Sequence, residues 1–291
     1  MAGTCTKALI VLVAALAVTT SASAASPDVS AMNLQLVDVP GAKITTQRLV
    51  TEKGYVSAHL RVFTFAAPNV SAHLSQVESE TKLASSASVP TAEIATTEKF
   101  FRSTSGRKNF IAGVAKGLKV KPKAVMVGKV RSVTGYDQGI EVPVSISLKG
   151  LRVYENIVYL RLDRVAVFMV EGGLRPIGAG VTAKFTAAIA GHIGTELAPI
   201  TVSPPTVTGT AQQGQTLTAA PGTWTASDAT FGYQWQRCDA AGANCVDVPG
   251  ATTSTYAVTA SDVGATLHVT ATATNRFGSA PATSMQTAVV T

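Results

Sequence analysis

The segment YQWQRCDAAGANC, residues 233–245, places two cysteines seven positions apart, the first of them three residues after Trp235. The chain has only three cysteines in 291 residues, and the third is Cys5. A bond between Cys238 and Cys245 would close a loop of about eight residues and fix the local fold. Whether that bond forms depends on the compartment in which the protein resides.

The first 25 residues have the pattern of a secretory signal peptide. Lys7 precedes the unbroken apolar run Ala8–Val18, and Ala22 and Ala24 follow in an Ala-x-Ala arrangement. The alternative is a transmembrane anchor, but the run has eleven residues. A helix that crosses a bilayer needs about 20. We therefore predict a signal peptide over residues 1–25 and no membrane span after its cleavage.

Cleavage removes Cys5 and leaves Cys238 and Cys245. An even pair of cysteines in an exported chain is most simply a disulfide. The rival is a metal site, which usually needs four ligands, and His268 is the only nearby imidazole in the sequence. We predict a disulfide between Cys238 and Cys245 and no bound metal.

Charge divides the rest of the chain into two parts. Residues 26–200 have 21 Lys and Arg against 13 Asp and Glu, whereas residues 201–291 have two Arg against four Asp. The junction contains Pro199, Pro204 and Pro205, which indicate a short stiff linker. We predict two domains, 26–200 and 201–291, each of ordinary size.

The second domain has short β-rich runs, with turn signals between them and no helical periodicity. Their spacing predicts an all-β sandwich. The runs are QTLTA, FGYQWQR, CVDVP, STYAVT, TLHVTATATN and SMQTAVV. Alternation places Tyr233 and Trp235 on one face of their run, as a pair directed at the core.

Three stretches of this domain resemble the immunoglobulin-like modules of secreted actinobacterial proteins. They are GQTLTAAPGTW (214–224), YQWQRCDAAGANCVDVPGATTSTYAVTASDVG (233–264) and ATATNRFGSA (271–280). The resemblance implies that Trp235 is the buried tryptophan of strand C, and that Cys238 and Cys245 staple the C–C′ hairpin. Antibody-type domains join strands B and F by a disulfide, whereas this chain has Leu217 and Val269 there.

The first domain mixes strand and helix patterns. Strands are expected over 42–50, 55–65, 70–79, 124–133, 140–148 and the long run 153–170. Apolar stripes predict helices over 105–118 and 181–193, and a helical pattern also covers 91–102. A mostly antiparallel sheet with covering helices gives an α+β fold. Arg161 and Asp163 fall on one face of the long run, where we expect a structural ion pair.

No catalytic constellation stands out. Ser-x-x-Lys occurs at Ser79–Lys82 and Ser105–Lys108, without the Ser-Asp-Asn or Lys-Thr-Gly motifs that would support it. The sequence has no Gly-x-Ser-x-Gly elbow, His-Glu-x-x-His helix or Walker loop. The four histidines are scattered without metal-ligand spacing: His59, His73, His192 and His268. We assign no catalytic, cofactor-binding or metal-ligating residue, and we expect no enzyme.

The clearest functional signal is a basic tract. From Lys99 to Arg131 there are ten Lys or Arg and no Asp or Glu in 33 residues. Its candidate polyanion contacts are Lys108, Lys116, Lys119, Lys121 and Lys123. The tract is interpreted either as a solvated face or as a polyanion-binding surface. Aromatic residues are not interleaved with the charges, so we expect no stacking platform for nucleic acid.

We expect a secreted bacterial binding or adhesion protein, released or loosely associated with the cell wall. Its basic first domain would contact an anionic cell-wall polymer, an acidic polysaccharide or phospholipid headgroups, with the second domain as a spacer or interaction unit. Two other classes stay open. A carrier would enclose an apolar ligand in the first domain, and an exported hydrolase would need ionisable groups converging in a pocket.

Overall fold

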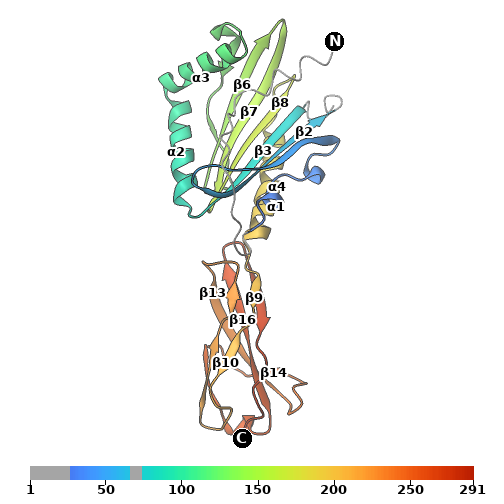
Figure 1. Ribbon diagram of the computed structural model, residues 1–291, viewed down its shortest axis with the longest axis vertical. Helices are drawn as coiled ribbons and strands as arrows, with labels where there is room; N and C mark the ends of the chain where they lie inside the picture. The colour runs from blue at the N-terminus through green and yellow to red at the C-terminus, as the bar shows by residue number, and fades with distance from the viewer. Residues whose placement is uncertain (1–26, 66–73) are drawn as a thin grey trace. The chain divides into compact units, whose positions relative to one another are not determined.

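The structure, a computed structural model, describes residues 27–65 and 74–291 (Figure 1). The predicted signal peptide, Cys5 and His73 lie outside the described residues. Contacts group the chain into two compact units, residues 28–193, here called the head, and residues 194–291, the second unit. The division falls near the end of helix α4 (Ala179–Leu197), just before the boundary expected at residue 200.

The head is built on one sheet whose neighbouring strands, in the described residues, are all antiparallel. The strand order is β1-β2-β3-β8-β7-β6-β4, and the short β5 pairs with β6. The strands are β1 (Ala42–Val50), β2 (Tyr55–Phe65), β3 (Leu74–Ala84), β4 (Val125–Val127), β5 (Arg131–Ser132), β6 (Gln138–Leu148), β7 (Leu151–Leu162) and β8 (Val165–Gly173). With its helices, this sheet has the predicted α+β character.

The single strand predicted over 153–170 is wrong, because this segment forms a hairpin. Leu162 ends β7 and pairs with Val165, the first residue of β8, across a two-residue turn. Asp163 adopts φ 55° in that turn, a left-handed conformation that Asp tolerates better than most residues. Apolar residues continue on both sides of the turn, so periodicity does not reveal it. The strand predicted over 124–133 is also divided, into β4 and β5.

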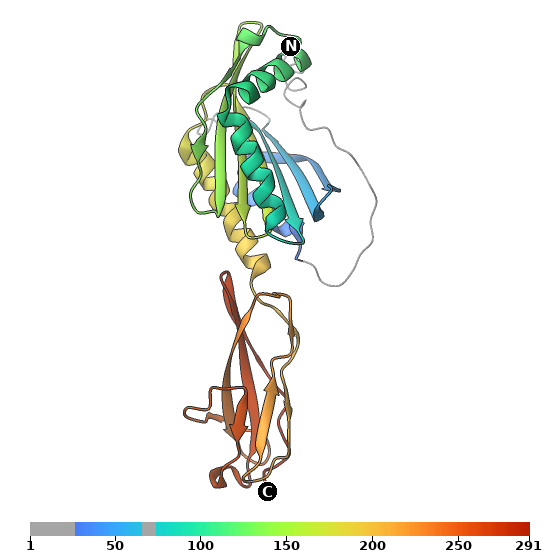
Figure 2. The same ribbon diagram turned by 90° about the vertical axis from the view of Figure 1, so that its left-hand side faces the viewer.

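Helices lie on both faces of the head sheet (Figures 1 and 2). On one face α2 (Ser88–Arg102) and α3 (Thr104–Gly117) pack over β6, β7 and β4. On the other face are α1 (Val29–Met32), which contacts β2 and β3, and α4, whose Thr182 donates a 2.6 Å hydrogen bond to Glu171 of β8. Two 3-10 turns complete the head, η2 (Leu36–Asp38) and η3 (Pro122–Ala124).

The core under α2 and α3 follows from the alternation of β6. Residues two apart in a strand share a face, and on this strand they are all aliphatic: Ile140, Val142, Val144 and Ile146. They pack with Phe101 of α2 and Val114 of α3. This apolar layer fixes α3 on the sheet and leaves the opposite side of the helix to solvent.

One residue separates α2 from α3. Ser103 follows α2, and its Oγ accepts a 2.9 Å hydrogen bond from the backbone nitrogen of Gly106, which caps α3. A Cβ at Gly106 would clash with the carbonyl oxygen of Phe100, so a glycine is needed for this tight junction. The break between the two helices therefore lies between the predicted helical ranges, 91–102 and 105–118.

Apart from the last turn of α4 and the turn η4 (Ala260–Asp262), the second unit is built of strands. They form three antiparallel sheets with the orders β10-β11-β15, β12-β9 and β14-β13-β16-β17. The strands are β9 (Thr201–Ser203), β10 (Thr206–Thr208), β11 (Thr216–Ala220), β12 (Thr223–Trp224), β13 (Thr230–Cys238), β14 (Val246–Asp247), β15 (Thr255–Ala257), β16 (Thr266–Asn275) and β17 (Gly278–Thr283). Trp235 is fully buried with Leu217 and Val269, so the three- and four-stranded sheets share one core.

Two sequence expectations for this unit are wrong. The proline-rich stretch is not a linker, because β9 pairs with β12, β10 pairs with β11, and Pro205 is buried. The run SMQTAVV forms no strand. Its backbone nitrogens at Ser284, Thr287 and Val290 donate to carbonyls of β16 or of the residue just before it. The bonding residues are three apart, whereas in a regular strand they are two apart. Among the described residues, no helix is long and apolar enough to cross a membrane.

Candidate functional site

Exposed cations gather where α3, η3 and the turn between β6 and β7 meet. The turn η3 follows α3 directly and contacts both α3 and β6. We define the basic surface as seven exposed side chains of these elements: Lys108, Lys116, Lys119, Lys121, Lys123, Lys149 and Arg152. The first five are the predicted polyanion contacts. The last two come from a segment that the sequence did not connect with them.

Helix α3 presents its lysines to solvent because its other side is fixed in the core. Val114 and Ala115 are buried, whereas Lys108 and Lys116 are exposed. A surface helix packs one apolar stripe against the core and leaves the rest of its circumference to solvent. Both lysines can therefore contact a ligand without any change in the packing of the head.

Helix α3 ends in a Schellman arrangement whose left-handed residue is a lysine. The backbone nitrogen of Val120 donates to the carbonyl of Ala115 at 2.9 Å, and that of Lys119 donates to Lys116 at 3.2 Å. Lys119 has φ 55°, where glycine is the usual residue. The strained position carries a cation at the carbonyl end of the helix, where the helix dipole favours positive charge.

Lys149 and Arg152 lie at the same end of the sheet. The hairpin between β6 and β7 turns through Lys149 and Gly150, whose φ values of 47° and 87° are those of a type I′ turn. Val125 of β4 pairs with Ile146 of β6, so η3, directly before β4, lies beside this turn. Sequence reasoning missed these two cations because they follow the acid-free tract at a distance. In the sequence, the only sign of these two residues is that a cation stands close to Gly150 on each side of it.

No acidic side chain of the described residues pairs with the basic surface. Other arginines of the tract are engaged. Arg102 pairs with Glu98 at 2.8 Å, Arg131 pairs with Glu141, and Arg107 donates to a backbone carbonyl. The seven side chains therefore form a patch of uncompensated positive charge, which attracts anions over about a Debye length.

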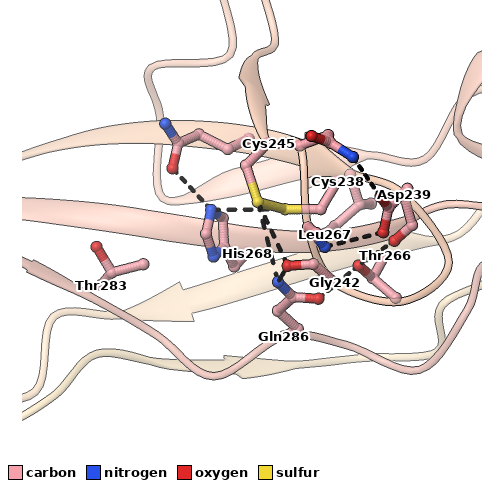
Figure 3. Close-up of a disulfide and its surroundings, with 12 residues drawn as sticks. Cys238, Asp239, Gly242, Cys245, Thr266, Leu267, His268, Thr283 and Gln286 are labelled. Atoms are coloured by element: carbon pink, nitrogen blue, oxygen red, sulfur yellow. Dashed lines mark hydrogen bonds between the residues drawn. A yellow bond between two sulfur atoms is a disulfide. The ribbon is translucent and has the colours of Figure 1, made fainter.

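The two late cysteines are joined, with an S–S distance of 2.00 Å (Figure 3). Cys238 is the last residue of β13 and Cys245 directly precedes β14, so the bond closes the loop of this hairpin. His268 Nε2 lies 3.9 Å from Cys238 Sγ. These three residues are the one group with metal-ligand spacing among the described residues. Disulfide sulfurs are not thiolates, so the joined pair does not bind zinc as cysteine ligands do.

The structure separates the members of one Ser-x-x-Lys motif. Ser79 and Lys82 point to opposite faces of β3, because residues three apart in a strand alternate. Lys82 Nζ lies 2.7 Å from Glu93 Oε1 on α2, and Tyr55 donates to the same carboxylate. In the second motif, Ser105 and the lysine three residues later are both exposed on α3.

The ion pair expected between Arg161 and Asp163 is wrong. Arg161 Nη1 lies 3.2 Å from the carboxylate of Asp137. Asp163 contacts Arg161 through its backbone carbonyl, at 2.9 Å, because it occupies the turn between β7 and β8. The arginine therefore ties the hairpin end to the segment before β6, which is a structural role.

The described histidines have local partners. His59 is buried beside Asn33, His192 Nε2 lies 2.9 Å from an Asp38 carboxylate oxygen, and His268 lies 2.7 Å from the side chain of Gln236. Burial lowers the pKa of His59 and of His268 below the ordinary value. The three residues lie on different elements and do not come together.

Sequence reasoning missed a polar group on the face of the head sheet that carries α2 and α3. In QVESETK, residues 76–82, every second residue is polar or charged, and these side chains share that face. Burial raises the pKa of Glu78 and of Glu80, and it raises the pKa of Glu155 on β7 to about 7, with a further contribution from Glu78. The signal that could have identified this group is the run of polar and charged residues inside a strand, where only Val77 is apolar.

No protein-family model and no curated protein matches the chain. Among solved structures, it is similar to the extracellular domain of PknH from Mycobacterium tuberculosis. The sequence identity is 9% and the TM-score is 0.38, and the match covers 59% of this chain and 98% of that domain. At this level of similarity the match identifies neither the fold nor the function of the chain.

Proposed function

We propose that the protein is an exported, non-enzymatic binding protein whose head binds anionic polymers through the basic surface. The observation that carries the proposal is a set of seven exposed cations, contributed by α3, η3 and one hairpin, that have no acidic partner in the part of the chain that the structure describes. A surface that serves only solubility does not need clustered cations, because charges of mixed sign keep a protein soluble equally well.

The rigid placement of the cations supports binding to a polymer rather than to a single small anion. They are distributed over three elements, and no buried polar side chain of the described residues forms a cradle among them. A polyanion can contact several of them at once and releases its condensed counterions when it does so. Affinity would then come from many weak contacts and decrease steeply with salt.

The expected compartment narrows the class of polymer. The predicted signal peptide over residues 1–25 and the disulfide between Cys238 and Cys245 both favour an exported protein. Outside a bacterial cell the abundant polyanions are anionic cell-wall polymers and acidic polysaccharides. We propose these as the ligands, with the protein released or loosely associated with the wall.

For the second unit we propose an immunoglobulin-like module that acts as a spacer or interaction unit. The strand orders β14-β13-β16-β17 and β10-β11-β15 support this, since they are the orders expected of strands C′-C-F-G and A-B-E. Trp235 on β13 packs between the two sheets, as the tryptophan of strand C does in that fold.

The proposal is tested by titrating the full chain with polygalacturonate, an acidic polysaccharide, and with neutral dextran over a series of salt concentrations. We expect saturable binding of polygalacturonate at low salt, a steep loss of affinity as salt rises, and no binding of dextran. Equal binding of the two polymers, or no binding of polygalacturonate at low salt, would contradict it.

A further inference from the structure

A polar strip crosses the head sheet on the side that carries α2 and α3. Figure 2 shows these helices in front of β6 and β7, and α2 also reaches β2 and β3 at one end, where Glu93 meets Lys82 and Tyr55. We define the acceptor face as the other end of this side, around Gly172, on β3, β8 and β7. Its polar residues include Gln76 and Glu78 of β3 and Glu155 of β7.

The register leaves a gap in the middle of this face. Gln76 pairs with Gly172 of β8, and Gly172 pairs with Glu155 of β7. Residues directly opposite one another point to the same side of a sheet, and glycine contributes no side chain. The Gln76 and Glu155 backbones are therefore roughly 10 Å apart, twice the spacing of neighbouring strands, and the buried Gly172 between them contributes no side chain.

Gln76 provides an independent sign that something is bound there. Its side chain is only 6% exposed, yet Oε1 has no hydrogen-bond partner among residues 27–65 and 74–291. A buried amide oxygen without a donor is costly, and native proteins rarely keep one. The oxygen lies on the same face as Glu155, across the gap, and it accepts hydrogen bonds only.

The carboxyl groups around the gap also have no donors. Neither Glu78 nor Glu155 forms a hydrogen bond or an ion pair with the described residues. Burial raises the pKa of both, although Arg48 on β1 partly offsets this for Glu78. The nearest lysine, Lys82, is already paired with Glu93 and Glu52. The three acceptors together therefore match a ligand that is rich in donors and positively charged.

Only two of the three acceptors are carboxylates, which disfavours a single metal ion. Among the described residues no group of three acidic or histidine side chains brings its ligand atoms within 4.8 Å of one another on this face. Oxygen ligands of a metal such as Ca²⁺ must converge more closely than that. An organic cation, whose several N–H groups point in different directions, fits separated acceptors better.

The surroundings of the gap are apolar. Val170 of β8 lies on the same side of the sheet and is half-buried, and Val62 of β2 flanks Glu78. Glu78 and Glu155 are also only half-buried, so solvent reaches the group. A hydrocarbon chain laid over these side chains would lose contact with water while its charged end stayed among the acceptors.

We propose that Gln76, Glu78 and Glu155, arranged around Gly172, form a binding site for an organic cation, an ammonium or guanidinium group attached to an apolar body. The site lies on a different part of the head from the basic surface and has the opposite charge. Its function is additional to polyanion binding, and neither proposal depends on the other.

The test is calorimetric titration of the full chain with hexylammonium chloride, compared with sodium hexanoate as an anion of similar length. We expect saturable binding of hexylammonium with a Kd on the order of 1 mM, and no binding of hexanoate. The variant E78Q/E155Q should weaken hexylammonium binding at least tenfold, and Gln76→Met, which keeps the length of the side chain but removes the oxygen, should weaken it several-fold.

The matched control is D228N/D247N, which removes two exposed carboxylates in the second unit. It should bind hexylammonium like the unaltered chain. Ellipticity at 222 nm verifies that each variant keeps its helices. The proposal is overturned if hexylammonium does not bind saturably, if hexanoate binds equally well, or if E78Q/E155Q binds like the control.

Discussion

Arg237 and Asp262 form an ion pair with a separation of 2.6 Å, in which the carboxylate is fully buried. The same carboxylate accepts hydrogen bonds from the Tyr256 hydroxyl at 2.8 Å and from the Thr259 backbone nitrogen at 2.7 Å. Burial alone would raise the pKa of Asp262, but the hydrogen bonds from Thr259, Tyr256 and Arg237 outweigh it and hold the pKa below its usual value. The residue therefore joins β13, β15 and η4.

Replacing Asp262 with alanine should lower the unfolding free energy of the second unit by about 3 kcal/mol, because it removes the counter-ion of Arg237 and leaves the Tyr256 and Thr259 donors unpaired. The measurement is denaturant unfolding followed by tryptophan fluorescence, since both tryptophans, Trp224 and Trp235, lie in this unit. The isosteric variant D262N should lose less. A loss below about 0.5 kcal/mol in D262A would mean that the network contributes little.

The disulfide should act on the second unit alone. Closing a loop of about eight residues removes chain entropy worth roughly 2.5 kcal/mol from the unfolded state. C238S/C245S should therefore lower the fluorescence-detected stability by about that amount and leave the helical signal at 222 nm unchanged. The unfolded protein should also show no free thiol before reduction once Cys5 has been removed. Two titratable thiols would disprove the bond.

The elements that the sequence predicts best are those with unambiguous punctuation. β1 and β2 match their predicted ranges, as does β16, because glycine, proline or polar turns bound each of them. The β7–β8 hairpin was missed because Asp163 turns without a glycine between two apolar runs. Similarly, the sequence predicts a linker where β9 forms, because prolines beside an edge strand cannot be told in sequence from prolines in a linker.

The sequence predicts only part of the basic surface, for a related reason. Its five lysines between Lys108 and Lys123 are close in sequence, so composition alone identifies them. Lys149 and Arg152 join them only through the pairing of Val125 with Ile146, and long-range register is not readable from one sequence. The group around Gly172 needs three strands in register, so only the polar run in β3 indicates it in the sequence.

A pH dependence should trace to Glu171. Burial raises its pKa to about 7 from an ordinary value of 4.5, so between these values the folded head binds more protons than the unfolded chain. The stability that this carboxyl contributes is therefore complete below pH 4.5 and is lost as pH rises through 7. Glu155 adds a contribution of the same sign, reduced by its exposure.

The variant E171Q separates the contribution of Glu171 to the pH dependence of stability from that of His59, which has the opposite sign. Going from about pH 5 to about pH 8.5, its stability should rise relative to the unaltered chain by about 2.5 kcal/mol. Thr182 can still donate to the amide oxygen, so the packing should persist. The measurement is urea unfolding followed at 222 nm, which reports the helices of the head. Parallel pH profiles of the two proteins would contradict the assignment.

Lys119→Gly should stabilise the head. The residue adopts φ 55°, which disfavours a side chain, and glycine should gain about 1 kcal/mol at a left-handed helix end. The variant should also bind polygalacturonate slightly less well, because one cation of the basic surface is lost. The variant K119Q is the control that separates backbone strain from charge. It should weaken polygalacturonate binding as much as K119G does, but it should leave the unfolding free energy almost unchanged. Equal stability of K119G and the unaltered chain would show that the position is not strained.

The most direct test of polyanion binding is the salt concentration that elutes the full chain from an immobilised acidic polysaccharide. One variant changes five residues of the basic surface to glutamine: Lys108, Lys116, Lys119, Lys121 and Lys123. The control removes the same charge from exposed positions elsewhere on the head: Lys43, Arg48, Lys53, Arg175 and Lys184. If the basic surface is the binding site, the first variant elutes at much lower salt and with a weaker salt dependence, while the control elutes close to the unaltered chain. If both variants elute at the same salt, only net charge matters and the basic surface is not a binding site.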